Sequence, residues 1–552
     1  MAMKEKPEII QLKNGICWKH DFDSFKATVY VPMAEEKLQA DILNYGFISP
    51  YLLVFAPKDF SFEEAVNFAD KNMLTKLAAD YASSVVFIYP KSGDWKSAKK
   101  DLFSDIISNS KIHEYYENGF VRNWNRFTKQ IDGYYIRGAI FRTCLFGVGD
   151  SADYIAKNCI NHFEGDGLWG RSDLAPVTCI LSKLSVIPDI SCRDIPVVSY
   201  DNSKEINDYI KKNCDYCLCK ENADFYTDYY SFAKKFRRMN GPLIIDEDVE
   251  ADGLIRETGM AIVKTSEDNF GDDKDKENHT IGYFAFYNKG LLQKGPLPLV
   301  LGFHGGGDSC FFFSIMAGWA KIAHRHNFLL VTIENHLNST ATEMVELIEH
   351  LKKKYPIDEK RIYATGFSMG GIKTWDLIQE YPQLLAAAAP MDATVDVGQN
   401  VYFMEIKKDV NKSVSVPIFY AAGEITPLPE LPFQEQKCLN RMAYALKLNR
   451  AVKEYNVKLE DKDNWQNKFW GIDGDFTLQK YDETRKSTLT MQLFKNNENK
   501  IYNVFASISD QGHDCREHTC EHAWNFMSRF TRDEKGIITG GGTEEILDCL
   551  KN

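Results

Sequence analysis

The sequence lacks any apolar run approaching the roughly 20 residues that a membrane helix needs, so no transmembrane segment is expected. Its first ten residues, MAMKEKPEII, contain no apolar core of a secretory signal. This favours a cytoplasmic protein, unless such a signal was removed, in which case the protein is secreted. Basic residues are not in excess either: 66 Lys and Arg stand against 78 Asp and Glu, a net charge of −12. Nucleic acid and membrane are therefore not expected as partners, because both require a basic surface.

A disulfide framework is not apparent, although the chain has 13 cysteines. Their number is odd, their positions are scattered, and most lie inside apolar stretches, as Cys144 and Cys179 do. Buried, reduced thiols of this kind are typical of proteins in a reducing compartment.

Composition excludes a disordered chain, because 44% of the residues are hydrophobic and 13% aromatic. A length of 552 residues allows two or more domains. The polar, turn-rich stretch around residues 240–255 marks the expected boundary. It divides an N-terminal α/β domain, residues 1–250, from a C-terminal domain, residues 251–552.

Apolar strand patterns alternate with helical patterns from residue 255 onward, which predicts a mainly parallel sheet covered by helices. Strands are expected within residues 280–288, 296–307, 328–336, 361–367, 384–393, 416–424 and 501–514. Helices are expected within residues 314–327, 342–355, 372–382 and 520–532, where apolar positions recur at three and four.

Residues 366–371, GFSMGG, match the G-x-S-x-G pattern of a nucleophile elbow. An apolar strand precedes Ser368 and a helical pattern follows it, as an elbow requires. A serine hydroxyl becomes a nucleophile only when a base takes its proton. The pattern also occurs by chance in roughly one chain in five of this length, so other residues must support the assignment.

A glycine-rich stretch, residues 304–307 (HGGG), follows an earlier apolar strand. Glycines there let backbone N–H groups approach a substrate oxygen, so Gly305, Gly306 and the N–H of Met369 are candidates for an oxyanion hole. The alternative is an ordinary glycine turn. The position upstream of a G-x-S-x-G favours the oxyanion loop.

Three histidines follow Ser368 in the chain: His513, His518 and His522. His513 comes directly after an apolar strand, and strand ends in a parallel sheet share one edge with the elbow. His518 and His522 are spaced as on one face of the closing helix. We therefore expect His513 to be the general base.

Residues 297–309, 355–371 and 512–530 together resemble an α/β-hydrolase, and more narrowly the poly(3-hydroxybutyrate) depolymerase and feruloyl esterase-like group. The resemblance covers roughly residues 255–535. It implies a Ser–His–acid triad, an acyl-enzyme and no cofactor.

The acid departs from the pattern of that group, which usually places an aspartate three residues after a glycine at the end of the next-to-last strand. Here the third residue after Gly423 is Thr426. Glu424 directly follows the strand and is our first choice, with Glu430 and Asp396 as alternatives. The acid would hold the imidazole in the correct tautomer.

The expected function is a serine carboxylic-ester hydrolase acting on a small-molecule or oligomeric ester, with oligomeric assembly left open. The alternatives are a serine peptidase of the prolyl-oligopeptidase type and a non-catalytic binding protein on the hydrolase fold. Side chains proposed to contact substrate are His304, Phe312, Trp319 and Trp470. For the aromatic stretch around Phe312 and Trp319, a buried helix is an equal reading.

The segment HDCREHTCEH, residues 513–522, also contains ligand types that zinc prefers. Because His513 is already assigned to catalysis, we expect no metal. Cys515 and Cys520 would instead form a local disulfide if the protein is exported.

The first 250 residues repeat the order of the C-terminal half. Residues 147–151 (GVGDS) align with the elbow and put Gly149 where Ser368 lies. APKD, residues 56–59, replaces the glycines of the oxyanion loop. We therefore predict a degenerate, non-catalytic hydrolase-like unit that arose by internal duplication.

Overall fold

The structure is a computed structural model, and the chain forms two compact units. The N-terminal unit extends to Glu247 and the C-terminal unit begins at Asp248, close to the predicted boundary. The structure describes all residues except 1–8, 33–49, 82, 113–123, 126–129, 132–138, 166–171, 175, 239–242, 270, 272, 307–308, 335, 394–395, 399–409, 426–434 and 552.

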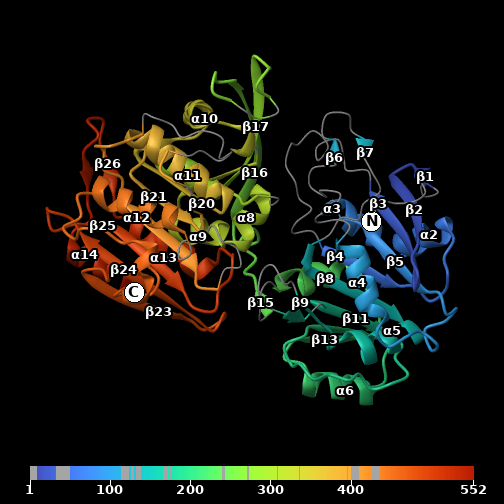
Figure 1. Cartoon of the computed structure of the whole chain (residues 1–552). Helices are drawn as coiled ribbons and strands as arrows, with labels where there is room; N and C mark the ends of the chain where they lie inside the picture. The colour runs from blue at the N-terminus through green and yellow to red at the C-terminus, as the bar shows by residue number, and fades with distance from the viewer. Residues whose placement is uncertain are drawn as a thin grey trace. The chain divides into compact units, whose positions relative to one another are not determined.

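The C-terminal unit is built on a ten-stranded mixed sheet (Figure 1). Its central strands are parallel, and antiparallel strands extend it at both edges. In spatial order the strands are β16 (Leu254–Lys264), β17 (Asn278–Asn288), β19 (Leu329–Ile333), β18 (Leu297–Phe303), β20 (Ile357–Phe367), β21 (Ala387–Met391), β22 (Ile418–Gly423), β25 (Ile501–Ile508), β24 (Ser487–Lys495) and β23 (Phe476–Asp482).

Helices cover both faces of this sheet. On one face, α10 (Ala341–Lys354), α11 (Met369–Glu380) and α12 (Gln436–Leu448) share an apolar core with the strands. On the other face lies α13 (Glu517–Met527), whose Trp524 packs on Tyr363 of β20 with ring centroids 5.6 Å apart. Burial of the central strands on both faces explains why they read as continuous apolar runs.

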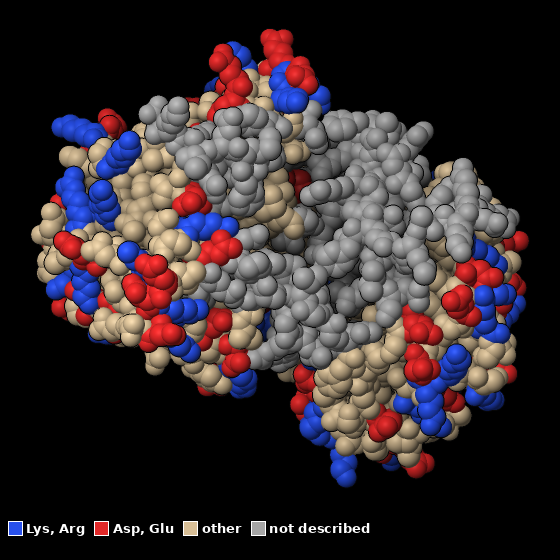
Figure 2. Space-filling model, viewed as in Figure 1, with Lys and Arg blue, Asp and Glu red and all other residues tan. Residues whose placement is uncertain are grey.

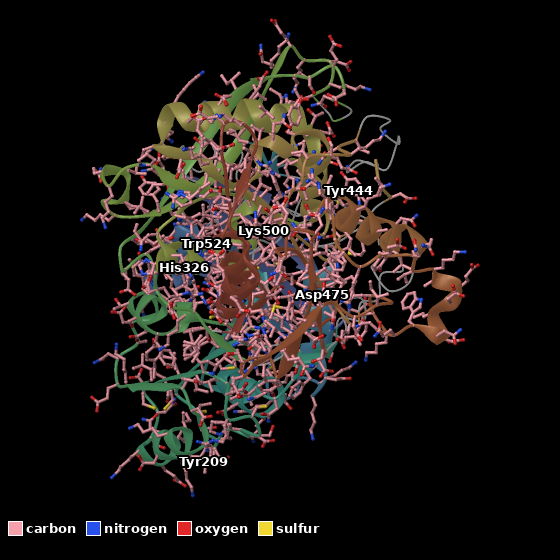
Figure 3. All side chains as sticks on the ribbon, turned by 90° about the vertical axis from the view of Figure 1, so that its left-hand side faces the viewer. Tyr209, His326, Tyr444, Asp475, Lys500 and Trp524 are labelled. Atoms are coloured by element: carbon pink, nitrogen blue, oxygen red, sulfur yellow. The ribbon has the colours of Figure 1, made fainter. Side chains whose placement is uncertain are left out.

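Near Trp524, α9 (Trp319–His326) packs against α13. The His326 and Trp524 rings lie 6.1 Å apart and are labelled side by side in Figure 3. The remaining short elements of the unit are α8 (Cys310–Met316), α14 (Thr543–Lys551), η5 (Leu291–Gln293), η6 (His336–Asn338), η7 (Pro382–Leu384), η8 (Leu459–Asn464), β26 (Thr531–Arg532) and β27 (Ile538–Thr539).

The N-terminal unit contains a nine-stranded sheet of the same design. Its order is β1 (Ile9–Leu12), β2 (Gly15–Asp21), β3 (Phe25–Pro32), β5 (Val85–Pro90), β4 (Pro50–Phe55), β8 (Ala139–Val148), β11 (Thr178–Ser182), β12 (Val197–Tyr200) and β13 (Cys217–Lys220). From β2 to β13, strand order and strand direction match those from β16 to β25. The predicted α/β class with a second α/β unit is confirmed.

The other elements of the N-terminal unit are α2 (Phe62–Lys71), α3 (Leu74–Asp80), α4 (Leu102–Ile112), α5 (Asp150–Tyr154), η3 (Ile155–Cys159), α6 (Lys204–Asn213), α7 (Phe225–Ser231), η4 (Ala233–Lys235), β6 (Trp124–Asn125), β7 (Gln130–Ile131), β9 (Phe163–Gly165), β10 (Ser172–Leu174), β14 (Phe236–Arg238) and β15 (Leu243–Ile245). On the described surface that Figure 2 shows, acidic and basic side chains are interspersed.

Candidate active site

Ser368 lies between β20 and α11 in a conformation that side chains rarely adopt. Its φ is 52° and its ψ −120°, and its backbone N–H donates to the carbonyl of Met391 at 3.0 Å. A non-glycine residue held at positive φ costs about 1–3 kcal/mol, so the surrounding structure must enforce it. The serine is only partly buried. This is the strained, accessible turn that the elbow pattern predicts.

The neighbouring glycines are required by close backbone packing. A Cβ on Gly366 would lie 2.2 Å from the carbonyl oxygen of Gly370. A Cβ on Gly370 would lie 2.1 Å from the carbonyl oxygen of Phe303, the last residue of β18. The elbow therefore lies against the strand that leads into the HGGG loop, and any larger residue at these positions would force them apart.

His513 lies in the loop between β25 and α13, beside the elbow. Its ring packs on that of Phe367, the residue before Ser368, with centroids 4.6 Å apart. The side chain is buried, with 5% of the residue exposed. The structure thus brings His513 against Phe367, the residue that precedes Ser368.

A carboxylate, that of Asp392, lies against His513. Its Oδ2 is 3.5 Å from His513 Nδ1 and also accepts the backbone N–H of Asp514 at 3.2 Å. Asp392 directly follows β21, has a φ of 50°, and donates its own N–H to the carbonyl of Ala421 at 2.7 Å. Burial raises the pKa of Asp392, and the contact with His513 opposes that rise.

Glu424, the carboxylate chosen from the sequence, lies elsewhere. Its Oε1 accepts a hydrogen bond from Ser507 Oγ at 2.8 Å, and burial raises its pKa against the lowering effect of that bond. Asp396 lies 3.5 Å from Asn440 Nδ2, and Glu430 falls outside the described residues. The structure thus places Asp392, and not Glu424, against His513. The sequence did contain a signal for Asp392, because this residue directly follows an apolar strand. That strand is one earlier than the strand after which we expected the acid.

The HGGG loop reaches the elbow at Met369. A Cβ on Gly306 would lie 2.4 Å from Met369 Sδ, so this glycine permits the close approach. Gly305 and Gly306 follow His304, the first residue after β18, whereas Gly307 lies outside the described residues. The three predicted oxyanion residues, Gly305, Gly306 and Met369, therefore lie at the same end of the sheet as Ser368.

His304 is buried and contacts backbone carbonyl oxygens, one of them in this loop. The residue is 3% exposed, and its Nδ1 and Nε2 contact the carbonyl oxygens of Gly305 and Glu334 at 2.7 and 2.8 Å. Nε2 of His336 in turn contacts the carbonyl oxygen of His304 at 2.9 Å. These contacts anchor the loop, and a substrate contact by His304 stays a prediction.

The aromatic candidates for substrate contact are also buried. Phe312 and Trp319 are 5% and 0% exposed, and the buried-helix reading applies to both. Trp470 is 1% exposed and packs on Tyr420 and Phe505 in the core. Sequence patterns missed a different apolar group beside Ser368, formed by Met369, Ile372, Ala393 and Leu337.

The Cys and His cluster of the C-terminal helix has local partners. Cys515 and Cys520 are free thiols with Sγ atoms 3.5 Å apart, and both contact Met391 Sδ. His522 Nδ1 contacts the carbonyl oxygen of His518 at 2.8 Å. Within the described part of the chain, no three His, Cys, Asp or Glu side chains are grouped as metal ligands.

The corresponding sheet edge of the N-terminal unit has different residues at the positions of Ser368, Asp392 and His304. Gly149 takes the place of Ser368, and its N–H donates to the carbonyl of Ser182 at 2.9 Å. Lys183, with a φ of 56°, follows β11 as Asp392 follows β21. Trp95 Nε1 donates to the carbonyl of Ala56, the residue that follows β4 as His304 follows β18. At the positions that correspond to Ser368 and Asp392, this unit therefore has Gly149 and Lys183.

None of the helices formed by the described residues combines the length and apolarity needed to cross a bilayer. No known protein-family profile matches the chain.

Two curated proteins are similar to part of the sequence. The bifunctional acetylxylan esterase/xylanase XynS20E of Neocallimastix patriciarum is 22% identical over 254 residues, which cover 44% of this chain and 33% of that protein. Poly(3-hydroxyalkanoate) depolymerase C of Paucimonas lemoignei is 26% identical over 113 residues, 17% of this chain and 27% of that protein. The chain thus spans a third or less of the curated relatives it matches.

Solved structures give similarly partial matches. A thermostable esterase is 24% identical, with a TM-score of 0.25, over 36% of this chain and 51% of that chain. An acetyl xylan esterase from Aspergillus awamori is 13% identical, with a TM-score of 0.32, over 49% of this chain and 99% of that chain. The two curated relatives confirm the resemblance to the esterase and depolymerase group that the motifs predict.

Proposed function

We propose that the protein is a serine carboxylic-ester hydrolase whose triad is Ser368, His513 and Asp392. The observation that carries this proposal is the contact of Asp392 with His513, beside a serine held at positive φ in a glycine-lined elbow. The three residues come from the exits of three parallel strands. Their order along the chain, serine, acid, histidine, is the order of α/β-hydrolases.

In the first half of the reaction, His513 takes the proton of the Ser368 hydroxyl as its oxygen attacks the ester carbonyl. The negative charge that develops on the carbonyl oxygen would be stabilised by backbone N–H groups of the Gly305–Gly306 loop and Met369. Protonated His513 then gives its proton to the departing alcohol, which leaves an acyl-serine.

In the second half, His513 takes a proton from water as the water attacks the acyl-serine. Collapse of that intermediate releases the carboxylic acid and returns the proton to Ser368. Asp392 stabilises the imidazolium in both halves. The mechanism requires no cofactor, because every proton is carried by these side chains and water.

The acyl group would lie near the apolar group formed by Met369, Ile372, Ala393 and Leu337. This favours short or apolar acyl chains. The names of the curated relatives, an acetylxylan esterase and a poly(3-hydroxyalkanoate) depolymerase, support acetyl and hydroxyalkanoyl esters as the first substrates to test.

The test is hydrolysis of p-nitrophenyl acetate and butyrate, methyl ferulate, acetylated xylan and poly(3-hydroxybutyrate) by the wild type and by Ser368→Ala. Ester hydrolysis that disappears in the variant supports the proposal. Cleavage of peptide p-nitroanilides, with none of the esters hydrolysed, would favour the peptidase alternative. Binding of an ester without turnover would favour the non-catalytic alternative.

A further inference from the structure

A buried ion pair lies directly beside the candidate base. Asp514 follows His513, and both Asp514 and Arg516 are 4% exposed. Arg516 Nε donates to Asp514 Oδ2 at 2.9 Å, and the backbone N–H of Cys515 donates to Asp514 Oδ1 at 2.8 Å. Burying an ion pair removes both charges from water, which costs free energy. Apolar residues of similar size often stabilise a fold at least as much as the pair does. Stability alone therefore gives little reason to place charges here.

The backbone of Asp514 contacts the candidate acid. Its N–H donates to Asp392 Oδ2 at 3.2 Å, the same oxygen that lies 3.5 Å from His513 Nδ1. Two adjacent residues of the loop thus contact the same carboxylate oxygen of Asp392: His513 through its imidazole and Asp514 through its backbone N–H. Rotation of the His513–Asp514 peptide would move both contacts together.

The side chains around Asp514 hold the adjoining peptide, between Asp514 and Cys515, and so restrict the backbone at Asp514. Gln511 Nε2 donates to the carbonyl of Asp514 at 2.9 Å, and Arg516 Nη1 reaches Ser487 Oγ on β24 at 3.4 Å. Burial raises the pKa of Asp514, but the charges of Arg516 and Arg485 lower it by more. The pKa of Asp514 therefore lies below its ordinary value. Asp514 is therefore ionised at neutral pH.

We propose that Asp514 is a positioning residue, whose carboxylate, held by Arg516, aims its own backbone N–H at Asp392 and so fixes the acid against His513. Asp514 does not contact the reacting atoms in this role. The inference rests on the proposed function, since it assigns a task within the same triad. Small displacements of catalytic groups cost up to about 100-fold in rate, so the role has a measurable size.

The test is a double-mutant cycle of Asp514→Asn and Asp392→Asn, read out as kcat and KM for p-nitrophenyl acetate. Asp514→Asn should lower kcat about 10- to 100-fold and leave KM within about twofold. In the Asp392→Asn background the same change should lower kcat by less than about twofold, because its effect acts through Asp392. An equal loss in both backgrounds would overturn the proposal.

Two further variants separate positioning from folding. Asp514→Asn leaves Arg516 buried without its partner, so Asp514→Asn/Arg516→Gln removes both charges and should recover thermal stability without recovering kcat. Asp510→Asn changes an exposed carboxylate of the same loop and should leave kcat unchanged. If the double variant recovers kcat together with stability, the pair is structural and the proposal is wrong.

The cycle also distinguishes this inference from the proposed function. If Asp392→Asn leaves kcat unchanged, Asp392 is not the acid, and the triad and the positioning role fall together. If Asp392→Asn strongly lowers kcat while Asp514→Asn does not, the triad stands and only the positioning role fails.

Discussion

Ser368 and Gly149 have nearly the same backbone conformation, with φ and ψ of 52° and −120° at the serine and 62° and −127° at the glycine. Each follows a central strand, begins a helix, and donates its N–H to the last residue of the next strand. Glycine adopts this conformation at no steric cost, whereas serine does so only under strain. The strained serine, Ser368, occurs in the unit that also contains His513 and Asp392, which supports a catalytic role for Ser368.

The first prediction is that Ser368→Ala lowers kcat/KM for p-nitrophenyl esters by about 10⁴-fold or more, because the nucleophile is lost. Circular dichroism should remain that of the wild type. Ser528→Ala, in the same unit but in α13's C-terminal turn, is the matched control and should retain activity. Full activity of Ser368→Ala would exclude Ser368 as the nucleophile.

The second prediction concerns the acid. Asp392→Asn should lower kcat by about 10⁴-fold, as expected when the acid of a triad is neutralised. Glu424→Gln should have a small effect, because its carboxylate bonds to Ser507. Measuring kcat for both variants compares two carboxylates that each follow a strand of the same sheet. The opposite ranking would restore the sequence-based choice of Glu424.

The third prediction is that a fluorophosphonate labels the protein on Ser368 only, and that His513→Ala prevents labelling by removing the base. Peptide mapping by mass spectrometry identifies the adduct. Gly149→Ser should create no second adduct, because the corresponding acid position is Lys183 and Trp95 bonds to the carbonyl of Ala56. An adduct at position 149 would show that the N-terminal unit can activate a serine, contrary to the predicted non-catalytic role.

The fourth prediction concerns backbone strain. Ser368→Gly should raise the free energy of unfolding by about 1 kcal/mol, because the strain at positive φ is relieved. Gly149→Ala should lower it by a similar amount; its Cβ would meet nothing within 4 Å, so only the φ penalty remains. Urea unfolding of both variants measures the two effects. Equal signs for the two changes would contradict the shared conformation.

The fifth prediction is that two neighbouring aspartates affect stability in opposite directions. The pKa of Asp392 is raised, so its ionised form destabilises the folded state at neutral pH, and this cost disappears as pH falls through that raised pKa. The pKa of Asp514 is lowered, so its contribution is present at neutral pH and is lost as pH falls through that lowered pKa.

At pH 7, Asp392→Asn should therefore be more stable than the wild type and Asp514→Asn less stable. Both differences should shrink at pH values below the ordinary pKa of a carboxyl group. Urea denaturation at neutral and acidic pH, with Asp510→Asn as the control, tests this. A loss of stability in Asp392→Asn at pH 7 would show that burial does not dominate at that carboxylate.

Local sequence patterns were sufficient to place the elbow, the glycine loop and His513 at one end of the sheet. Each of these features is encoded within a few residues: Gly366 is required by a contact within the turn itself, and His513 lies in the short loop after β25. The strand and helix alternation also predicted the parallel sheet, and the pairing of Gly149 with Ser368 appeared in the order of elements alone.

Which carboxylate contacts His513, and the environment of the aromatic residues, were decided only by the tertiary structure. Asp392 and Glu424 both directly follow apolar strands, so their sequence contexts are equivalent. Asp392 contacts His513 because its positive φ and its bonds to Ala421 and Asp514 direct it toward a loop far along the chain. A sequence pattern places a residue at the end of a strand, but the direction of its side chain depends on neighbouring strands and loops.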